Sequence, residues 1–232
     1  MATIKLFVSN SMRGVMDVLV PRFEQSSGHK LSISYDPAKV MMERIRKGES
    51  ADLAILGGTA IADLEKMGKI AAGSIRAVSS CGVGLSVGAR ARKPEIGSVD
   101  SFKRALLAAK SIAYTEQGAS GIYFSKLIED LGIASPVKSK AIRRSGGLIG
   151  ELVAAGEAEM AVQQIPELMA VQGIRFVGPF PKEVQMITQS SAGIFSGAGE
   201  PAAAKAFLDF LLTPSSARVF KAKGHEPAQG QG

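Results

Sequence analysis

Two stretches of the sequence carry the residue types of an anion-binding turn: an apolar run, then small or hydroxyl-bearing residues, then an amphipathic segment. The first apolar run, residues 4–8, continues into Ser9, Asn10 and Ser11. The second, residues 111–115, leads to Gly118, Ala119, Ser120 and Gly121. Two such turns in one chain predict a ligand cleft formed by both.

The chemistry of these turns follows from the start of a helix. The first N–H groups have no partner inside the helix, and the summed peptide dipoles place partial positive charge there. Small side chains let a ligand reach those N–H groups, and serine hydroxyls add further donors. The alternative for each serine is that of an ordinary N-cap, because Ser and Asn are preferred at that position in any helix.

Amphipathic helices must position both turns. After the second turn, apolar residues fall at helical spacing: Phe124, Leu127, Ile128 and Leu131. After the first turn, the same spacing is seen: Met16, Leu19, Val20 and Phe23. Pro21 lies inside the first pattern and is expected to kink or break that helix, because proline has no N–H to donate.

Strand-like and helix-like segments alternate along the chain, which predicts an α/β protein with largely parallel sheets. The expected strands are residues 4–8, 31–35, 52–56, 112–114, 160–163 and 174–177. Two longer runs, residues 75–88 and 184–196, interrupt the alternation and are interpreted as extended crossings between two lobes. The last six residues, 227–232, are expected to be disordered because they are rich in Gly, Gln and Pro.

Composition limits the possible functions. The 232 residues are 46% apolar, which excludes a largely disordered chain, and no apolar run is long enough to span a bilayer. The formal charge of +7 is compatible with nucleic acid, an acidic membrane surface or a small anionic ligand. Nucleic acid is the weakest of the three, because the basic residues are scattered and aromatics make up only 6%. Neither a cofactor nor a nucleic-acid partner is expected.

Residues for catalysis or metal binding are scarce. Cys81 is the only cysteine, so neither a disulfide nor a thiolate metal site is predicted. The two histidines, His29 and His225, are expected to be solvated surface residues, which leaves a Ser/His pair or a zinc site hard to build. Asp52 is interpreted as a structural cap rather than a general base.

Four segments, in order, resemble the solute-binding proteins of bacterial ABC importers, and within that group the molybdate-binding type. These segments are residues 8–12, residues 48–55, residues 118–123, and residues 156–159 with Val162. The resemblance runs from Ile4 to about Gly224 and is most specific between Ala119 and Leu131. It implies a two-lobed type II periplasmic-binding-protein fold, with each lobe a mostly parallel sheet flanked by helices.

The resemblance also implies a domain division and a mechanism. Lobe 1 would comprise residues 1–78 and 192–232, lobe 2 residues 79–191, with hinge strands near residues 77–82 and 188–193. The lobes would close over a small anion held by hydroxyl and N–H groups. Carried over by position, Ser11 matches the serine of the first lobe and Ser120 a backbone donor of the second. ABC permease subunits would be the protein partners of a monomer without enzymatic activity.

The sequence departs from the molybdate-binding pattern at three places. Ala38 stands where a ligand serine is expected, and Lys39 follows it. The other changes are the segment Arg143-Arg144-Ser145-Gly146 and the pair Gln163-Gln164, which replaces a stretch with a tyrosine. Lost hydroxyls and gained cations favour a carboxylate or another larger anion over molybdate, with Lys39, Arg144, Ser145, Gly146 and Gln164 near the ligand. The alternative, that these side chains are ordinary surface groups, stays open.

Two other functions remain open at this stage. A cytoplasmic anion-sensing domain would use the same closure to control a partner protein. A transferase with the same two-lobed plan is the third hypothesis. Location depends on the start of the chain: the protein is expected in the periplasm if a leader peptide has been removed, and in the cytoplasm if Met1 is the native start.

Overall fold

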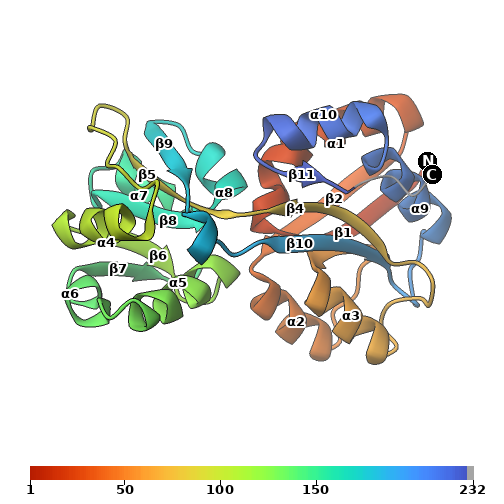
Figure 1. Cartoon of the computed structure of the whole chain (residues 1–232). Coiled ribbons are helices and arrows are strands. Elements are labelled where there is room, and N and C mark those ends of the chain that lie inside the picture. The colour runs from red at the N-terminus through yellow and green to blue at the C-terminus, as the bar shows by residue number, and fades with distance from the viewer. Residues whose placement is uncertain (229–232) are drawn as a thin grey trace. The chain divides into compact units, whose positions relative to one another are not determined.

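The chain divides into two compact units (Figure 1). The computed structural model describes residues 1–228. Unit 1 comprises Met1–Cys81 and the segment from Thr188 onward, and unit 2 comprises Gly82–Ile187. The polypeptide therefore leaves unit 1 after Cys81 and re-enters it at Thr188.

Unit 1 is built on a six-stranded sheet in the order β11-β4-β10-β3-β1-β2. Its elements are β1 (Thr3–Ser9), the 3-10 helix η1 (Asn10–Met12), α1 (Arg13–Ser27), β2 (Lys30–Asp36), α2 (Ala38–Arg46), β3 (Leu53–Gly57), α3 (Gly58–Lys66), β4 (Arg76–Cys81), β10 (Thr188–Ile194), α9 (Pro201–Leu211), α10 (Pro214–Ala222) and β11 (Glu226–Pro227). Strands β2, β1 and β3 are parallel, whereas β10, β4 and β11 are antiparallel to their neighbours.

Unit 2 is built on a five-stranded sheet in the order β7-β6-β8-β5-β9. Its elements are β5 (Val83–Gly88), α4 (Val99–Ala108), β6 (Ile112–Thr115), α5 (Ala119–Asp130), α6 (Ala134–Lys138), β7 (Ala141–Arg144), α7 (Gly150–Ala154), β8 (Met160–Gln164), α8 (Ile165–Met169), β9 (Ile174–Pro179) and the 3-10 helix η2 (Lys182–Val184). Strands β7, β6 and β8 are parallel, and β5 pairs antiparallel with β8 and β9.

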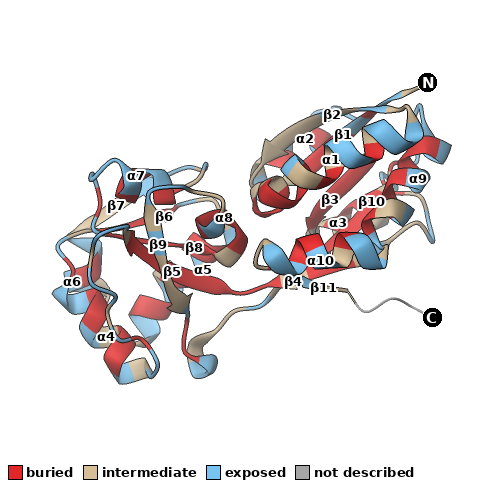
Figure 2. Ribbon diagram, turned by 90° about the horizontal axis from the view of Figure 1, so that it is seen from above, coloured by how far each residue is buried: buried red, intermediate tan, exposed pale blue. Residues whose placement is uncertain are grey.

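Each sheet has helices on both faces, so its central strands are buried between them (Figure 2). In unit 1, α1, α9 and α10 pack on one face and α2 and α3 on the other. In unit 2, α4, α5 and α6 cover one face and α7 and α8 the other. Burial on both faces explains why the central strands read as nearly continuous apolar runs rather than as alternating patterns.

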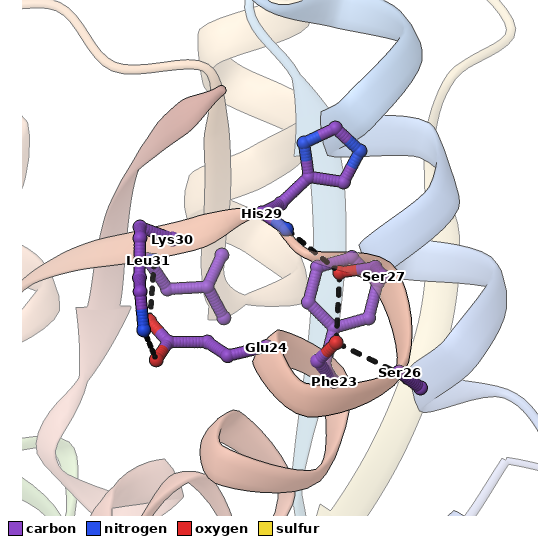
Figure 3. Close-up of polar contacts among 7 residues, drawn as sticks. All are labelled: Phe23, Glu24, Ser26, Ser27, His29, Lys30 and Leu31. Carbon is purple, nitrogen blue, oxygen red and sulfur yellow. Dashed lines mark hydrogen bonds and ion pairs between the residues drawn. The ribbon is translucent and has the colours of Figure 1, made fainter. Parts of the chain in front are cut away.

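A side-chain carboxylate sets the position of β2 next to β1. Glu24 near the end of α1 accepts hydrogen bonds from the Leu31 N–H and from Lys30 Nζ, both at 2.9 Å (Figure 3). Gly28, at a φ of 73°, ends the helix in the left-handed conformation that glycine adopts without strain. The resulting parallel register places Ser9 opposite Asp36, so the loops after the two strands begin at the same edge of the sheet.

The prediction of a two-lobed α/β fold is confirmed. Apart from the short strand β11, the strands that introduce antiparallel pairing come from the two runs interpreted as crossings: β4 and β5 lie within the first, and β10 within the second. The sequence reasoning missed α3, α6, α8, α10 and the short strand β7, whose exposed arginines conceal its strand pattern.

Two local expectations need correction. Pro21 does not break α1, which continues from Arg13 to Ser27. Pro21 and Asp17, four residues earlier, are both exposed, so the Asp17 carbonyl can bond to water. The expected disorder of residues 227–232 does not apply to Pro227, which pairs with Ser79 in the strand β11. Residues 229–232 lie outside the described part of the chain.

None of the helices within residues 1–228 combines the length and apolar character that crossing a membrane requires.

Asp52 has the structural role expected for it. It is buried, at 5% exposure, and its two carboxylate oxygens accept the N–H groups of Lys5 at 2.7 Å and Glu200 at 2.9 Å. The carboxylate thus joins the start of β1 to the segment before α9.

Replacing this carboxylate tests that role. Asp52→Ala leaves two N–H groups without their acceptor and should lower the free energy of unfolding by about 2–4 kcal/mol, whereas Asp52→Asn keeps one acceptor and should cost less. Urea denaturation measures both, with Asp130→Asn as the exposed control, expected within about 0.5 kcal/mol of wild type. Equal stabilities for all three variants would contradict the assignment.

Candidate anion-binding site

The first predicted anion-binding turn lies at the carboxyl end of β1, in unit 1. Ser9 is the last residue of the strand, and Asn10 and Ser11 form the 3-10 turn that leads into α1. Ser11 is buried, at 4% exposure, and its Oγ lies 3.2 Å from Ser9 Oγ. Neither hydroxyl caps the helix in the structure, so the ordinary N-cap alternative does not account for them.

A buried histidine contacts the Ser11 turn and fixes its position. His225 is 1% exposed; its Nε2 lies 3.0 Å from the Ser11 carbonyl oxygen and its Nδ1 3.1 Å from Ser79 Oγ. Since a carbonyl only accepts, Nε2 carries the proton and Nδ1 accepts from the serine hydroxyl. Burial lowers the pKa of His225 to about 4, so the ring is neutral at physiological pH.

The expectation that both histidines are solvated was wrong. His225 is buried because the end of the chain returns to β4, where Glu226 pairs with Ser80. His29 is half-buried, and its Nδ1 accepts the Ala2 N–H at 3.2 Å.

The start of α2 lies beside the first turn. Ala38 is its first residue, directly after Pro37, and Lys39 is exposed. Asp36, the last residue of β2, forms an ion pair with Arg44, which also binds Glu49 at 2.7 Å. The hydrogen bond to Glu49, followed by the one to Asp36, raises the pKa of Arg44. Arg44 of α2 therefore neutralises the charge of Asp36.

A third helix, which the sequence analysis missed, also starts at this edge of the sheet. Helix α3 begins at Gly58, directly after the last residue of β3, Gly57. A Cβ on Gly58 would lie 3.3 Å from Ser191 Oγ, so the glycine permits a close approach to β10. The signal was present in the sequence as two glycines and a threonine after a buried strand.

The second predicted anion-binding turn lies in unit 2, between β6 and α5. Gly118 precedes the helix, and its carbonyl accepts the N–H groups of Gly121 at 3.1 Å and Ile122 at 3.0 Å. No hydrogen bond within the described chain engages the N–H groups of Ala119 or Ser120, which open the helix. Ser120 is buried, at 2% exposure.

Thr115 is a further polar residue at this turn, and the sequence analysis did not select it. Its Oγ1 is buried and, within residues 1–228, has no hydrogen-bond partner. A Cβ built on Gly118 would lie 2.4 Å from this oxygen, so the hydroxyl sits directly beneath the first turn of α5. Thr115 and Gly121 also line a groove of about 470 Å³ beside α5.

The loop after β7 brings Ser145 and Gly146 to the same edge of the sheet, because β7 and β6 are parallel and pair Arg144 with Thr115. Arg144 itself points elsewhere: its Nη2 lies 3.7 Å from Glu157 Oε2, and its side chain is 48% exposed. The structure therefore gives Arg144 a partner other than a ligand.

The two glutamines of β8 have different roles. Gln163 is 1% exposed; it accepts the Ile149 N–H and donates to the Gly147 carbonyl, both at 2.8 Å, and so holds the loop after β7. Gln164, the last residue of the strand, is 8% exposed and directly precedes α8. Of the two amides, Gln163 is the one that satisfies neighbouring backbone.

Next to these glutamines lies a buried carboxyl group. Glu167 is 8% exposed, and burial raises its pKa to about 8, although hydrogen bonds from the Gln164 N–H and the Gln163 side chain favour the charged form. The carboxyl is therefore mostly protonated at neutral pH.

Within each unit, the predicted residues gather at the carboxyl edge of the parallel strands. In unit 1 these residues are Ser9, Asn10, Ser11 and Ala38; in unit 2 they are Gly118, Ala119, Ser120, Gly121, Ser145, Gly146 and Gln164. The side chains of Lys39 and Arg144 are exposed at the surface. In the described part of the chain, no group of three His, Cys, Asp or Glu residues is placed to hold a metal ion.

Known proteins match both the sequence and the fold. The model of the family described as bacterial extracellular solute-binding protein matches residues 4–226. An aconitate isomerase from Pseudomonas sp is 30% identical, over 99% of this chain and 89% of its own. The molybdate-binding protein ModA of Escherichia coli K12 is 24% identical, over 95% of this chain and 88% of its own. The structure of the periplasmic molybdate-binding protein of Azotobacter vinelandii superposes with a TM-score of 0.81 at 17% identity, covering 97% of this chain and all of that chain.

The chain belongs to the bacterial extracellular solute-binding proteins. Within that family its fold is the two-lobed one of the molybdate-binding type, as the sequence resemblance implied.

The close packing at Gly121 yields a sharp prediction. A Cβ at this position would lie 1.7 Å from the Thr115 carbonyl oxygen, so Gly121→Ala must displace α5 from the end of β6. We expect a loss of about 2 kcal/mol or more in the free energy of unfolding. The matched control is Gly97→Ala, where a Cβ meets no atom within 4 Å. Equal unfolding midpoints in urea for the two variants would show that the junction is looser than described.

The buried carboxyl group predicts a pH dependence. Because the pKa of Glu167 is raised to about 8 from 4.5, the folded protein keeps a proton that the unfolded chain releases, and stability falls as pH rises from 4.5 to 8. Glu167→Gln mimics the protonated form, so the variant should become steadily more stable than wild type between pH 5 and pH 8.

Urea denaturation at several pH values measures this difference, and Glu95→Gln, at an exposed position, is the control. If the free energies of unfolding of Glu167→Gln and wild type change in parallel between pH 5 and pH 8, Glu167 ionises normally in the folded protein.

Proposed function

We propose that this protein is the solute-binding component of an ABC importer and captures a small organic anion bearing carboxylates. The two units would close over the ligand by bending at the crossings after Cys81 and before Thr188. Ligand binding would stabilise the closed form, which then docks on the permease. Export from the cytoplasm is part of this proposal.

The observation that carries the proposal is the pair of turns with buried serines at helix starts. Ser11 and Ser120 are 4% and 2% exposed, and each lies where a parallel strand passes into a helix. Helix N-terminal N–H groups bind anions without a counter-charge. The buried hydroxyl of Thr115, which lacks a partner within residues 1–228, adds a donor at the second turn.

Two observations favour an organic anion over molybdate. Ala38 supplies no hydroxyl at the start of α2, which removes a charge-assisted hydrogen bond of about 1.5–3 kcal/mol from a tetrahedral oxyanion. The relative at 30% identity is named for aconitate, a tricarboxylate, whereas the relatives named for molybdate are 24% and 26% identical.

Calorimetry with a panel of anions tests the proposal. The panel contains molybdate, sulfate, trans-aconitate, citrate and tricarballylate. We expect a polycarboxylate to bind most tightly. Ser11→Ala, which removes a hydroxyl, and Ser120→Pro, which removes an N–H and a hydroxyl, should each weaken its binding at least about 10- to 100-fold. Proline is tolerated in the first turn of a helix, as Pro166 shows in α8.

Ser125→Ala, further along α5, is the control and should bind like wild type. Unchanged affinity in both Ser11→Ala and Ser120→Pro would refute the proposed site.

The second candidate function is isomerisation of the bound acid. It is favoured by the relative named aconitate isomerase and by Glu167, whose raised pKa suits proton exchange near neutral pH. Moving a double bond requires a group that removes a proton from carbon and returns one. Proton NMR of trans-aconitate in deuterated buffer measures both the appearance of the cis isomer and deuterium uptake. Binding without either signal would reject this function.

A further inference from the structure

An arginine beside the first turn has no carboxylate partner. Arg13 opens α1, two residues after Ser11, and its guanidinium carbon lies 4.2 Å from the centre of the Tyr35 ring. Among residues 1–228, no carboxylate lies within ion-pair distance of Arg13; Asp17, one turn further along α1, is exposed and does not pair with it. The charge of Arg13 is therefore unmatched.

The Tyr35 ring fixes the guanidinium of Arg13 but does not engage its N–H donors in hydrogen bonds. A cation over an aromatic face is attracted by the ring electrons, and a guanidinium held that way keeps its N–H edges free for hydrogen bonds. Burial, aided by the nearby charge of Asp17, raises the pKa of Tyr35 to about 12, so the ring beneath Arg13 is a neutral phenol. The half-buried pair is preorganised for an incoming carboxylate.

Neighbouring residues set Arg13 apart from the other cations of this edge. Arg44 is occupied by Asp36 and Glu49, and Lys39 is exposed. Arg13 alone among these three is both fixed by a contact and without a counter-charge.

The sheet register places the Arg13–Tyr35 pair beside the first turn. Tyr35 on β2 is paired with Val8 on β1, the residue before Ser9. Adjacent strands lie about 4.8 Å apart, so the ring beneath Arg13 belongs to the strand next to the one that leads into the Ser11 turn. An inorganic tetrahedral oxyanion held at the Ser11 turn is too small to extend toward the β2 side as well.

We propose that Arg13, held over Tyr35, binds a second carboxylate of the ligand and selects polycarboxylates over inorganic oxyanions. The inference rests on the proposed function, because it assumes that the first carboxylate is bound by the N–H and hydroxyl groups of the Ser11 turn. Arg13 would then be a specificity-determining residue.

Calorimetry with tricarballylate, glutarate, acetate and sulfate tests this assignment in wild type, Arg13→Gln and Arg13→Lys. We expect Arg13→Gln to weaken tricarballylate binding 10- to 100-fold while changing sulfate or acetate binding less than twofold. Arg13→Lys keeps the charge but not the planar fork and should fall between the two. Arg22→Gln, at an exposed position of the same helix, is the matched control and should resemble wild type.

The possible failures are distinct. If Arg13→Gln weakens the binding of all four ligands equally, or of none, the role of Arg13 is overturned. The proposed function still stands in that case, provided that Ser11→Ala weakens binding. Affinity that is insensitive to Ser11→Ala, or absence of binding by any carboxylate to wild type, would overturn the proposed function and the Arg13 assignment together. Circular dichroism confirms that each variant is folded.

Discussion

The structure depends on one constraint: a parallel strand that ends at the edge of a sheet must pass directly into a helix whose first N–H groups have no partner inside that helix. In unit 1 this happens after β1, β2 and β3, and in unit 2 after β6 and β8. Parallel pairing brings those helix starts to one edge of each sheet. In the proposed function, anion binding is thus a property of the main chain, and side chains determine only which anion fits.

The side chains around the turns serve mainly to keep that main chain in place. His225 holds the Ser11 carbonyl, Gln163 holds the loop after β7, and Gly121 allows α5 to approach the Thr115 carbonyl. The positive charges are arranged differently. Arg44 and Arg144 are paired with carboxylates of the chain, and Arg13 rests on an aromatic ring. This difference is the physical basis for assigning ligand selection to Arg13.

Much of the fold was predictable from local patterns. The apolar run before Ser9 and the helical spacing after Ser120 were sufficient to place β1 and α5, because both signals lie within a few residues of the turn they position. The fate of individual polar side chains was not predictable in the same way. His225 is buried by contacts with Ser79 and Ser11, 146 and 214 positions away in the sequence. Arg144 was selected as a ligand cation because its partner Glu157 lies beyond the next helix along the chain.

The central claim is that main-chain N–H groups of both turns bind the same anion. Amide ¹H–¹⁵N NMR during titration with trans-aconitate tests it most directly, since it reports each N–H group separately. The account predicts that the Asn10, Ser11, Ala119 and Ser120 resonances shift together, with one shared dissociation constant. Shifts confined to one turn, or to the groove residues Ser125 and Lys126 along α5, would contradict it.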